Sequence, residues 1–222
     1  MLKNSLLAAA LLSASAMSVT AQASTVNLSY AGANTMVATS VSINGSTGTY
    51  WMGSSNLNIS DAANTLVGFC VDPLQPAVSA ANAYDKSTLD ASDFISGNGA
   101  TRFANAQKLY DNAYATLSGA EQTAGFRLAL WEIFHDDLST STGTIKAVIG
   151  SNAGMVAAAS TYLSALSGWN STGAYALTFY GNATKQDFLV ASPSAVPVPA
   201  ALPLMASGLL GFSFLRRRKN TN

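Results

Sequence analysis

The sequence predicts an α+β fold, with an antiparallel, barrel-like β-sheet as its core and a central group of three helices. Segments of alternating apolar and polar residues come first and return at the end, and segments with helical spacing of apolar residues lie between them. The body between the two apolar ends, residues 24–195, has 172 residues, which is the size of one domain with its own core. The last strands are therefore expected to close a sheet that the first strands begin.

Short strands are predicted in the first part of the body. They span residues 25–30, 36–43, 50–52, 57–59 and 66–71. Asn44 and Gly45 form a turn signal after the second strand, and Asp72 followed by Pro73 ends the last one. Residues 74–100 are rich in Asp, Ser, Asn and Gly, and we expect them to be mostly loop.

Helices are predicted over residues 102–114, 119–135 and 152–166. Ser118 and Glu121 have the spacing of a capping box at the start of the second helix, and Gly168 follows the third. The second helix should be largely buried, because it is apolar on much of its circumference. Its predicted core positions are Phe126, Leu130, Ile133 and Phe134 on one face and Leu128 and Trp131 on another. Strands are expected again at 174–180 and 187–191.

The first 23 residues have the features of a secretory signal peptide. Lys3 supplies a positive charge and residues 6–16 a short apolar core. Ala21 and Ala23 are the small residues of a cleavage site, which places the mature start at Ser24. The alternative is an uncleaved membrane anchor, against which the short core and the cleavage site argue. We therefore expect residues 24–192 to form an exported body.

Residues 193–222 form a tail in three parts. Pro197 and Pro199, with Val198 between them, keep the chain extended, because proline fixes φ and disfavours a helical conformation in the preceding residue. The next 16 uncharged residues, 200–215, would span about 24 Å as a helix, which is short for a bilayer core of about 30 Å. The cations that end the tail would stop translocation: Arg216, Arg217, Arg218 and Lys219.

This order of a Pro-x-Pro motif, a short apolar helix and an Arg-rich end resembles the PEP-CTERM tails of bacterial exosortase substrates. The resemblance covers residues 196–222 and departs from the family pattern at Val198, where glutamate is usual. It implies that an exosortase, a membrane-embedded cysteine protease, removes the tail and releases the body to the cell surface or extracellular matrix. An ordinary single-span tail anchor is the alternative, since bilayer thinning can accommodate a short apolar segment.

The body is acidic once both ends are set aside. It has six cations against all eleven acidic residues of the chain, a net charge of −5. Because such a body gains nothing from the release of phosphate counterions, nucleic acid is not an expected partner. Cys70 is the sole cysteine, so no intramolecular disulfide can form.

No nucleotide-binding, serine-hydrolase or paired-cysteine metal motif occurs in the sequence. His135, Asp136 and Asp137 could together contact a metal, but adjacent residues on a helix point in different directions, and we interpret them as a polar helix C-terminus. We expect no metal and no cofactor. Cys70 and His135 could pair as nucleophile and base, but an apolar strand cysteine is more often a small core residue.

Three short motifs resemble the bacterial thioester-domain superfamily: GFCVD at 68–72, GFRLALWE at 125–132 and QDFLV at 186–190. In that superfamily a strand cysteine and a helix glutamine join in an internal thioester that captures amines. At the glutamine position, four residues before Trp131, this chain has Arg127, which offers no amide carbonyl to a thiol. Gln122 lies off the face of residue 127, and Gln107 belongs to the preceding helix. The resemblance thus implies the fold, with Cys70 and Arg127 at degenerate thioester positions.

These patterns predict a non-enzymatic, exported protein of the cell surface or extracellular matrix, which an exosortase sorts and which takes part in adhesion or associates with exopolysaccharide. The expected partners are the exosortase, the inner membrane during sorting, and a polysaccharide or other surface ligand. The main alternative is a covalent adhesin whose thioester uses another glutamine, and the third is a Cys-His hydrolase. Arg127 and Trp131 are i,i+4 neighbours on a helix, so a stacked guanidinium is a structural role for Arg127.

Overall fold

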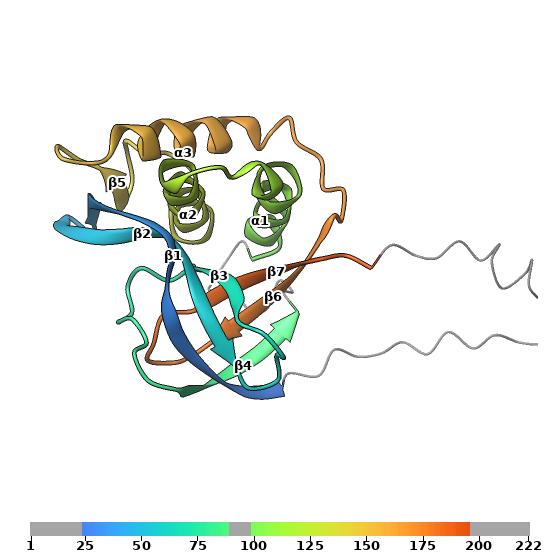
Figure 1. Ribbon diagram of the computed structural model, residues 1–222. Coiled ribbons are helices and arrows are strands. Elements are labelled where there is room, and N and C mark those ends of the chain that lie inside the picture. Colours follow the sequence, from blue (N-terminus) through green and yellow to red (C-terminus); the bar gives the residue numbers. More distant parts are fainter. Residues whose placement is uncertain (1–23, 89–98, 196–222) are drawn as a thin grey trace, which may run out of the picture.

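In the part of the chain that the structure describes, a seven-stranded antiparallel sheet carries three α-helices on one side (Figure 1). The computed structural model describes residues 24–88 and 99–195. The arrangement confirms the predicted α+β class, with a barrel-like antiparallel sheet and a central group of helices. The predictions for the signal peptide and for the sorting tail fall outside the described residues. Within those residues, no helix is long and apolar enough to cross a membrane.

The strands form one sheet that closes on itself. They are β1 (Ser24–Ile43), β2 (Ser46–Ile59), β3 (Leu66–Cys70), β4 (Asn82–Thr88), β5 (Ile145–Ala147), β6 (Tyr175–Gly181) and β7 (Phe188–Pro193). Their order is β2-β3-β7-β6-β4-β1-β5, and a further pairing of β2 with β1 completes the closure. Because β7 inserts between β3 and β6, the end of the body closes the sheet, as the sequence predicted.

The first two strands are longer than predicted, since each joins two of the predicted short strands. Asn44 and Gly45 have φ angles of 51° and 80°, and they form the tight turn that their sequence indicates. The alternation of β1 is interrupted by register shifts between Tyr30 and Gly32 and again between Ala33 and Thr35. These irregularities break the pattern that marks a strand in the sequence, although the ladder continues on both sides of them.

Two strands were missed in segments that the sequence left without regular structure. β4 lies inside the predicted loop 74–100 and pairs with both β1 and β6. Its sequence is mostly polar and so gives no strand pattern, and Tyr84 is a side chain that it buries fully. β5 is three residues long and pairs with the end of β1. Both strands depend on distant pairing partners, which no local pattern reveals.

The helices agree closely with the prediction. They are α1 (Gly99–Ala113), α2 (Ala120–His135) and α3 (Ala153–Ala165), with a short 3₁₀ turn, η1 (Tyr114–Thr116), after α1. Every residue of α2 from Thr123 to Phe134 is buried, as its apolar circumference predicted. One face packs in a cluster around Phe126 and Phe134, and the other packs Leu128 and Trp131 against the β1–β2 hairpin and α3.

The predicted capping box at the start of α2 is wrong. The N-cap residue is Gly119, and no side chain caps the helix there. Ser118 lies one position earlier, and its backbone N–H and hydroxyl both donate to the Gln122 side-chain oxygen at 2.9 and 2.8 Å. Glu121 instead accepts a hydrogen bond from Asn152, whose own oxygen caps α3 by accepting from the Met155 N–H. The tertiary contact with α3 outweighs the local motif.

Candidate ligand-binding site

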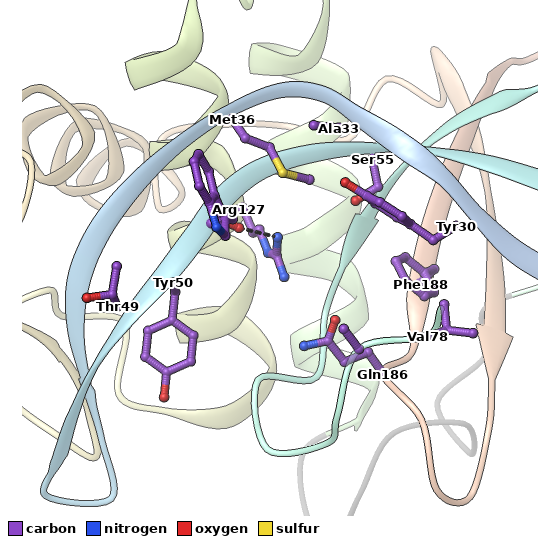
Figure 2. Close-up of a pocket in the computed structure, with 12 residues that line it drawn as sticks. Tyr30, Ala33, Met36, Thr49, Tyr50, Ser55, Val78, Arg127, Gln186 and Phe188 are labelled. Carbon is purple, nitrogen blue, oxygen red and sulfur yellow. Dashed lines mark hydrogen bonds between the residues drawn. The ribbon is translucent and has the colours of Figure 1, made fainter. Parts of the chain in front are cut away.

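A cavity of about 510 Å³ opens between the β1–β2 hairpin and the middle of α2. Figure 2 shows Arg127 near its centre, beneath the arch of the two strands. The rest of the wall consists of side chains from β1, β2 and β7, from the loop after β3, and from Gln186 just before β7. The residues that matter for its chemistry are Tyr30, Tyr50, Trp51, Arg127, Gln186 and Phe188. Arg127 is the one charged residue in this wall.

Arg127 is held in place by the sheet and by its own helix. Its Nη1 donates to the Trp51 carbonyl at 2.9 Å, a bond drawn in Figure 2. Its guanidinium carbon lies 5.0 Å from the ring centre of Trp131, one helical turn along α2. The predicted stacking of these i,i+4 neighbours is therefore present. Strand β2 and helix α2 together fix the direction in which the guanidinium points.

The charge of Arg127 has no carboxylate partner among the described residues. The residue is only 6% exposed, yet no carboxylate of residues 24–88 or 99–195 lies within ion-pair distance of it. Its Nε is buried and makes no hydrogen bond. A buried guanidinium normally lies beside an anion, because transfer of an isolated charge out of water is unfavourable. This side chain thus has both positive charge and unused donor capacity at the wall of a cavity.

Cys70 lies against the same helix, as the prediction for its strand required. The Trp131 Nε1 donates to the Cys70 carbonyl at 3.0 Å, and the thiol donates to the Asp72 carbonyl at 3.3 Å. Burial raises the pKa of the thiol, while the nearby Arg127 guanidinium opposes that rise. Cys70 is fully buried and is not part of the cavity wall. The structure therefore brings Cys70 and Arg127 together and keeps the thiol protonated at neutral pH.

The glutamines considered from the sequence are engaged elsewhere. Gln122 accepts hydrogen bonds from Ser118 at the start of α2. Gln107 donates to Asp111 and to the Tyr175 carbonyl, between α1 and β6. Gln186 and Arg127 both line the cavity, and both are labelled in Figure 2. Sequence reasoning did not assign Gln186 to the site, because its position depends on the packing of the loop before β7.

Aromatic side chains surround the cavity on its strand side. Trp51 is 67% exposed and Tyr30 is 38% exposed, which is high for large apolar residues. Tyr50 meets the buried Trp131 edge-to-face at 5.9 Å between ring centres. These rings come from the two long strands, and neither motif comparison nor periodicity had marked them as functional. The opening of the cavity is therefore lined by aromatic rings, which surround the positive charge of Arg127.

The polar C-terminal end of α2 contains the other candidate residues, His135, Asp136 and Asp137. His135 hydrogen-bonds through Nε2 to the Val71 carbonyl at 2.7 Å, and burial lowers its pKa. The Cys70 thiol donates to the Asp72 carbonyl, so Cys70 and His135 each form a hydrogen bond with a backbone oxygen. The hydrogen bond between nucleophile and base that a Cys-His hydrolase needs is therefore not formed between these two described residues. Asp136 and Asp137 lie close to Glu132, which the sequence did not single out. Burial, followed by these two carboxylates, raises the pKa of Glu132 to about 9.

Comparison with known proteins shows a structural likeness and no sequence match. No family model matches the sequence, and no curated protein matches it. Among solved structures, the chain is similar to the N-terminal domain of the Streptococcus pyogenes pilus tip adhesin Cpa, with 14% sequence identity and a TM-score of 0.48. The match covers 64% of this chain and 85% of that chain. The fold class assigned here rests on the chain's own sheet and helices.

Proposed function

We propose that this chain is an exported, non-enzymatic protein of the cell surface or extracellular matrix that binds a carboxylate-bearing ligand at the cavity around Arg127. The observation that carries the proposal is the buried guanidinium, which lines a cavity and has no carboxylate partner among the described residues. A ligand carboxylate would supply the missing anion. Arginine suits this role because its planar fork can donate two parallel hydrogen bonds to one carboxylate.

The lining indicates the class of ligand. Trp51 and Tyr30 offer exposed ring faces beside a single positive charge. A sugar ring has apolar C–H faces that pack on aromatic rings, and an acidic sugar adds a carboxylate for Arg127. Gln186 adds an amide, which can donate to and accept from sugar hydroxyl groups. An acidic polysaccharide, built from uronic acid units, therefore fits the wall of this cavity better than a neutral or cationic ligand.

The negative net charge of the body affects how the affinity for an acidic polysaccharide depends on salt. Residues 24–195 carry a net charge of −5, which repels a polyanion at long range. Attraction is therefore confined to the cavity, where Arg127 acts at contact distance. Salt screens the exposed charges over about 8 Å at physiological ionic strength and weakens that repulsion more than it weakens a buried contact. Moderate salt should consequently leave the affinity little changed, unlike binding that depends on surface charge.

The location of the protein follows from its two ends. The signal peptide directs export, and the tail with Pro197, Val198 and Pro199 resembles the sorting signal that an exosortase removes. The inner membrane then holds the chain only as an intermediate, through the apolar span and its terminal cations. Such sorting would deliver the body to the cell surface or extracellular matrix, where the proposal places its acidic polysaccharide ligand.

Arg127 also makes non-covalent binding the preferred mode. A thioester needs an amide carbonyl beside Cys70, and the guanidinium occupies that position instead. The covalent adhesin remains the second candidate, and its thioester would need a glutamine at another position. Gln107 and Gln122 are hydrogen-bonded to other groups.

The experiment is a binding titration of the purified protein with an oligosaccharide of uronic acids and with its methyl-esterified counterpart, which has the same shape without the charge. Arg127→Met removes the guanidinium and keeps a long side chain, and Arg102→Met on α1 is the matched control. We expect the acid to bind more tightly than the ester, and Arg127→Met to lose at least about tenfold in affinity, as when a charge-assisted contact is removed. Equal affinity for acid and ester, no binding of either, or full binding by Arg127→Met would each refute the proposal.

A further inference from the structure

A second cluster of polar groups lies at the C-terminal end of α2, apart from the cavity. The side chains of Glu132, Asp136 and Asp137 each offer an oxygen, and these oxygens all lie within 4.8 Å of one another. Two oxygens that bind the same calcium ion can be at most about 5 Å apart, since each lies about 2.3–2.6 Å from the ion. The three carboxylates thus have the spacing of ligands on one ion.

Glu132 is the observation that points to a ligand. It is fully buried, and neither of its carboxylate oxygens accepts a hydrogen bond of normal geometry, although the Ser139 N–H, which donates to Asp137, is near enough to oppose the rise of its pKa. Buried carboxylates in folded proteins are normally paired, hydrogen-bonded or bound to a metal. Here two more carboxylates lie within 4.8 Å, and the C-terminal end of a helix adds a further negative potential. A cation between the three side chains would satisfy all of these groups together.

The two aspartates are held by the loop that follows the helix. Asp137 accepts hydrogen bonds from the Ser139 N–H at 3.0 Å and from the Thr142 hydroxyl at 2.8 Å. Asp136 accepts from the Ile145 N–H at the start of β5. Each carboxylate oxygen has two lone pairs, so these contacts orient the aspartates and still leave acceptor capacity for an ion. His135, the neighbour expected from the sequence to belong to this polar end, points to the Val71 carbonyl instead.

We propose that Glu132, Asp136 and Asp137 form a binding site for a calcium ion. The set consists of hard oxygen ligands, which calcium prefers, and it contains neither the thiolate nor the imidazole that softer metals favour. Asp137 is exposed, so water can complete the coordination shell and the ion can enter. Bound calcium would tie the end of α2 to the loop that leads into β5.

The test is a calcium titration of the full chain, freed of metal by chelation, followed by calorimetry and by thermal unfolding. Terbium, a luminescent calcium substitute, is a second probe, since the neighbouring Trp131 can sensitise its emission. We expect one calcium per chain, a dissociation constant of about 10⁻³ M or tighter, as in extracellular calcium modules, and a raised melting temperature on binding. Glu132→Gln should weaken calcium binding at least about tenfold, as loss of a metal-site partner does.

The controls distinguish a metal site from a buried carboxyl group that is protonated and binds no ion. Asp137→Asn removes an exposed ligand, so it should fold and still lose binding even if Glu132→Gln does not fold. Asp85→Asn, an exposed carboxylate on β4, should bind calcium like the unchanged protein. The proposal is overturned if neither calcium nor terbium binds, or if Asp137→Asn binds as tightly as the Asp85→Asn control.

Discussion

Arg127 and Cys70 decide what chemistry the centre of this molecule can perform. A thiol beside a glutamine can form an acyl bond, whereas a thiol beside a guanidinium has no carbonyl to attack. Arginine in that position supplies charge and donors instead, and its hydrogen bond to the Trp51 carbonyl and its contact with Trp131 fix its direction. Under the proposed function, a guanidinium at this position therefore supports non-covalent recognition, whereas an amide would permit covalent recognition.

Cys70 should behave as an inert thiol. Because burial raises its pKa above the usual value, the folded protein contains less reactive thiolate at any given pH than a free cysteine would. We expect Cys70 to react with a thiol reagent only after denaturation, and the reaction of the folded protein to stay slow up to about pH 9, where an exposed thiol of pKa about 8.5 is largely ionised. A fast reaction of the folded chain, measured against the denatured chain, would contradict this expectation.

At the scale of elements, α2 connects the two halves of the core. Its Phe126 face belongs to the cluster formed with α1, α3 and β7, and its Trp131 face belongs to the cluster formed with the β1–β2 hairpin. The same helix carries Arg127 to the cavity and Glu132 to the acidic cluster. Stability and both proposed sites thus depend on one buried helix.

Phe126→Ala and Phe134→Ala should each lower the free energy of unfolding by about 3–5 kcal/mol, because both side chains are at most 1% exposed and their removal leaves a cavity. Ile149→Ala is the control, since Ile149 is fully exposed and should change stability by no more than about 0.5 kcal/mol. Denaturant unfolding of the variants measures these differences. A loss below about 1 kcal/mol for either phenylalanine would show that the face does not pack as described.

The helices could be predicted from the sequence, and part of the sheet could not. The helical spacing of apolar residues is a local signal, and it located α2 and α3 to within about a turn. β4 gave no such signal, because among its residues of described burial, 82–87, only Tyr84 is fully buried, and its strand conformation comes from pairing with β1 and β6. The capping box failed for a related reason, since Glu121 contacts Asn152 of the α3 cap rather than its own helix end.

At the scale of the whole molecule, the proposed function assigns separate tasks to the two ends and to the body. The ends carry five of the eleven cations of the chain, and the proposal gives them export and sorting. The body carries all the acidic residues, and it contains the cavity. The pairing of Cys70 with Arg127 could be anticipated from short motifs, whereas the cavity could not. Its walls come from β1, β2, α2 and the loop before β7, which only the closed sheet brings together.

Replacing Arg216, Arg217, Arg218 and Lys219 by neutral residues should impair maturation in the native host, because these cations stop translocation and keep the tail on the cytoplasmic side. We expect the uncleaved form to accumulate and the released form to decrease, as seen by immunoblotting of cell and medium fractions. Replacing Lys185 in the body by a neutral residue is the control and should leave maturation unchanged. Normal release of the tail variant would argue against the sorting signal.

The central claim, that Arg127 makes this a non-covalent binding protein, is tested most directly by the intact mass of the protein released from its native host, before and after treatment with methylamine. Thioester formation expels one ammonia, and methylamine opens a thioester by adding to the glutamine. The account predicts a mass equal to that of the processed sequence with Cys70 as a free thiol, and no change with methylamine. A mass lower by one ammonia, together with a methylamine adduct on any glutamine, would contradict the account and establish the covalent adhesin.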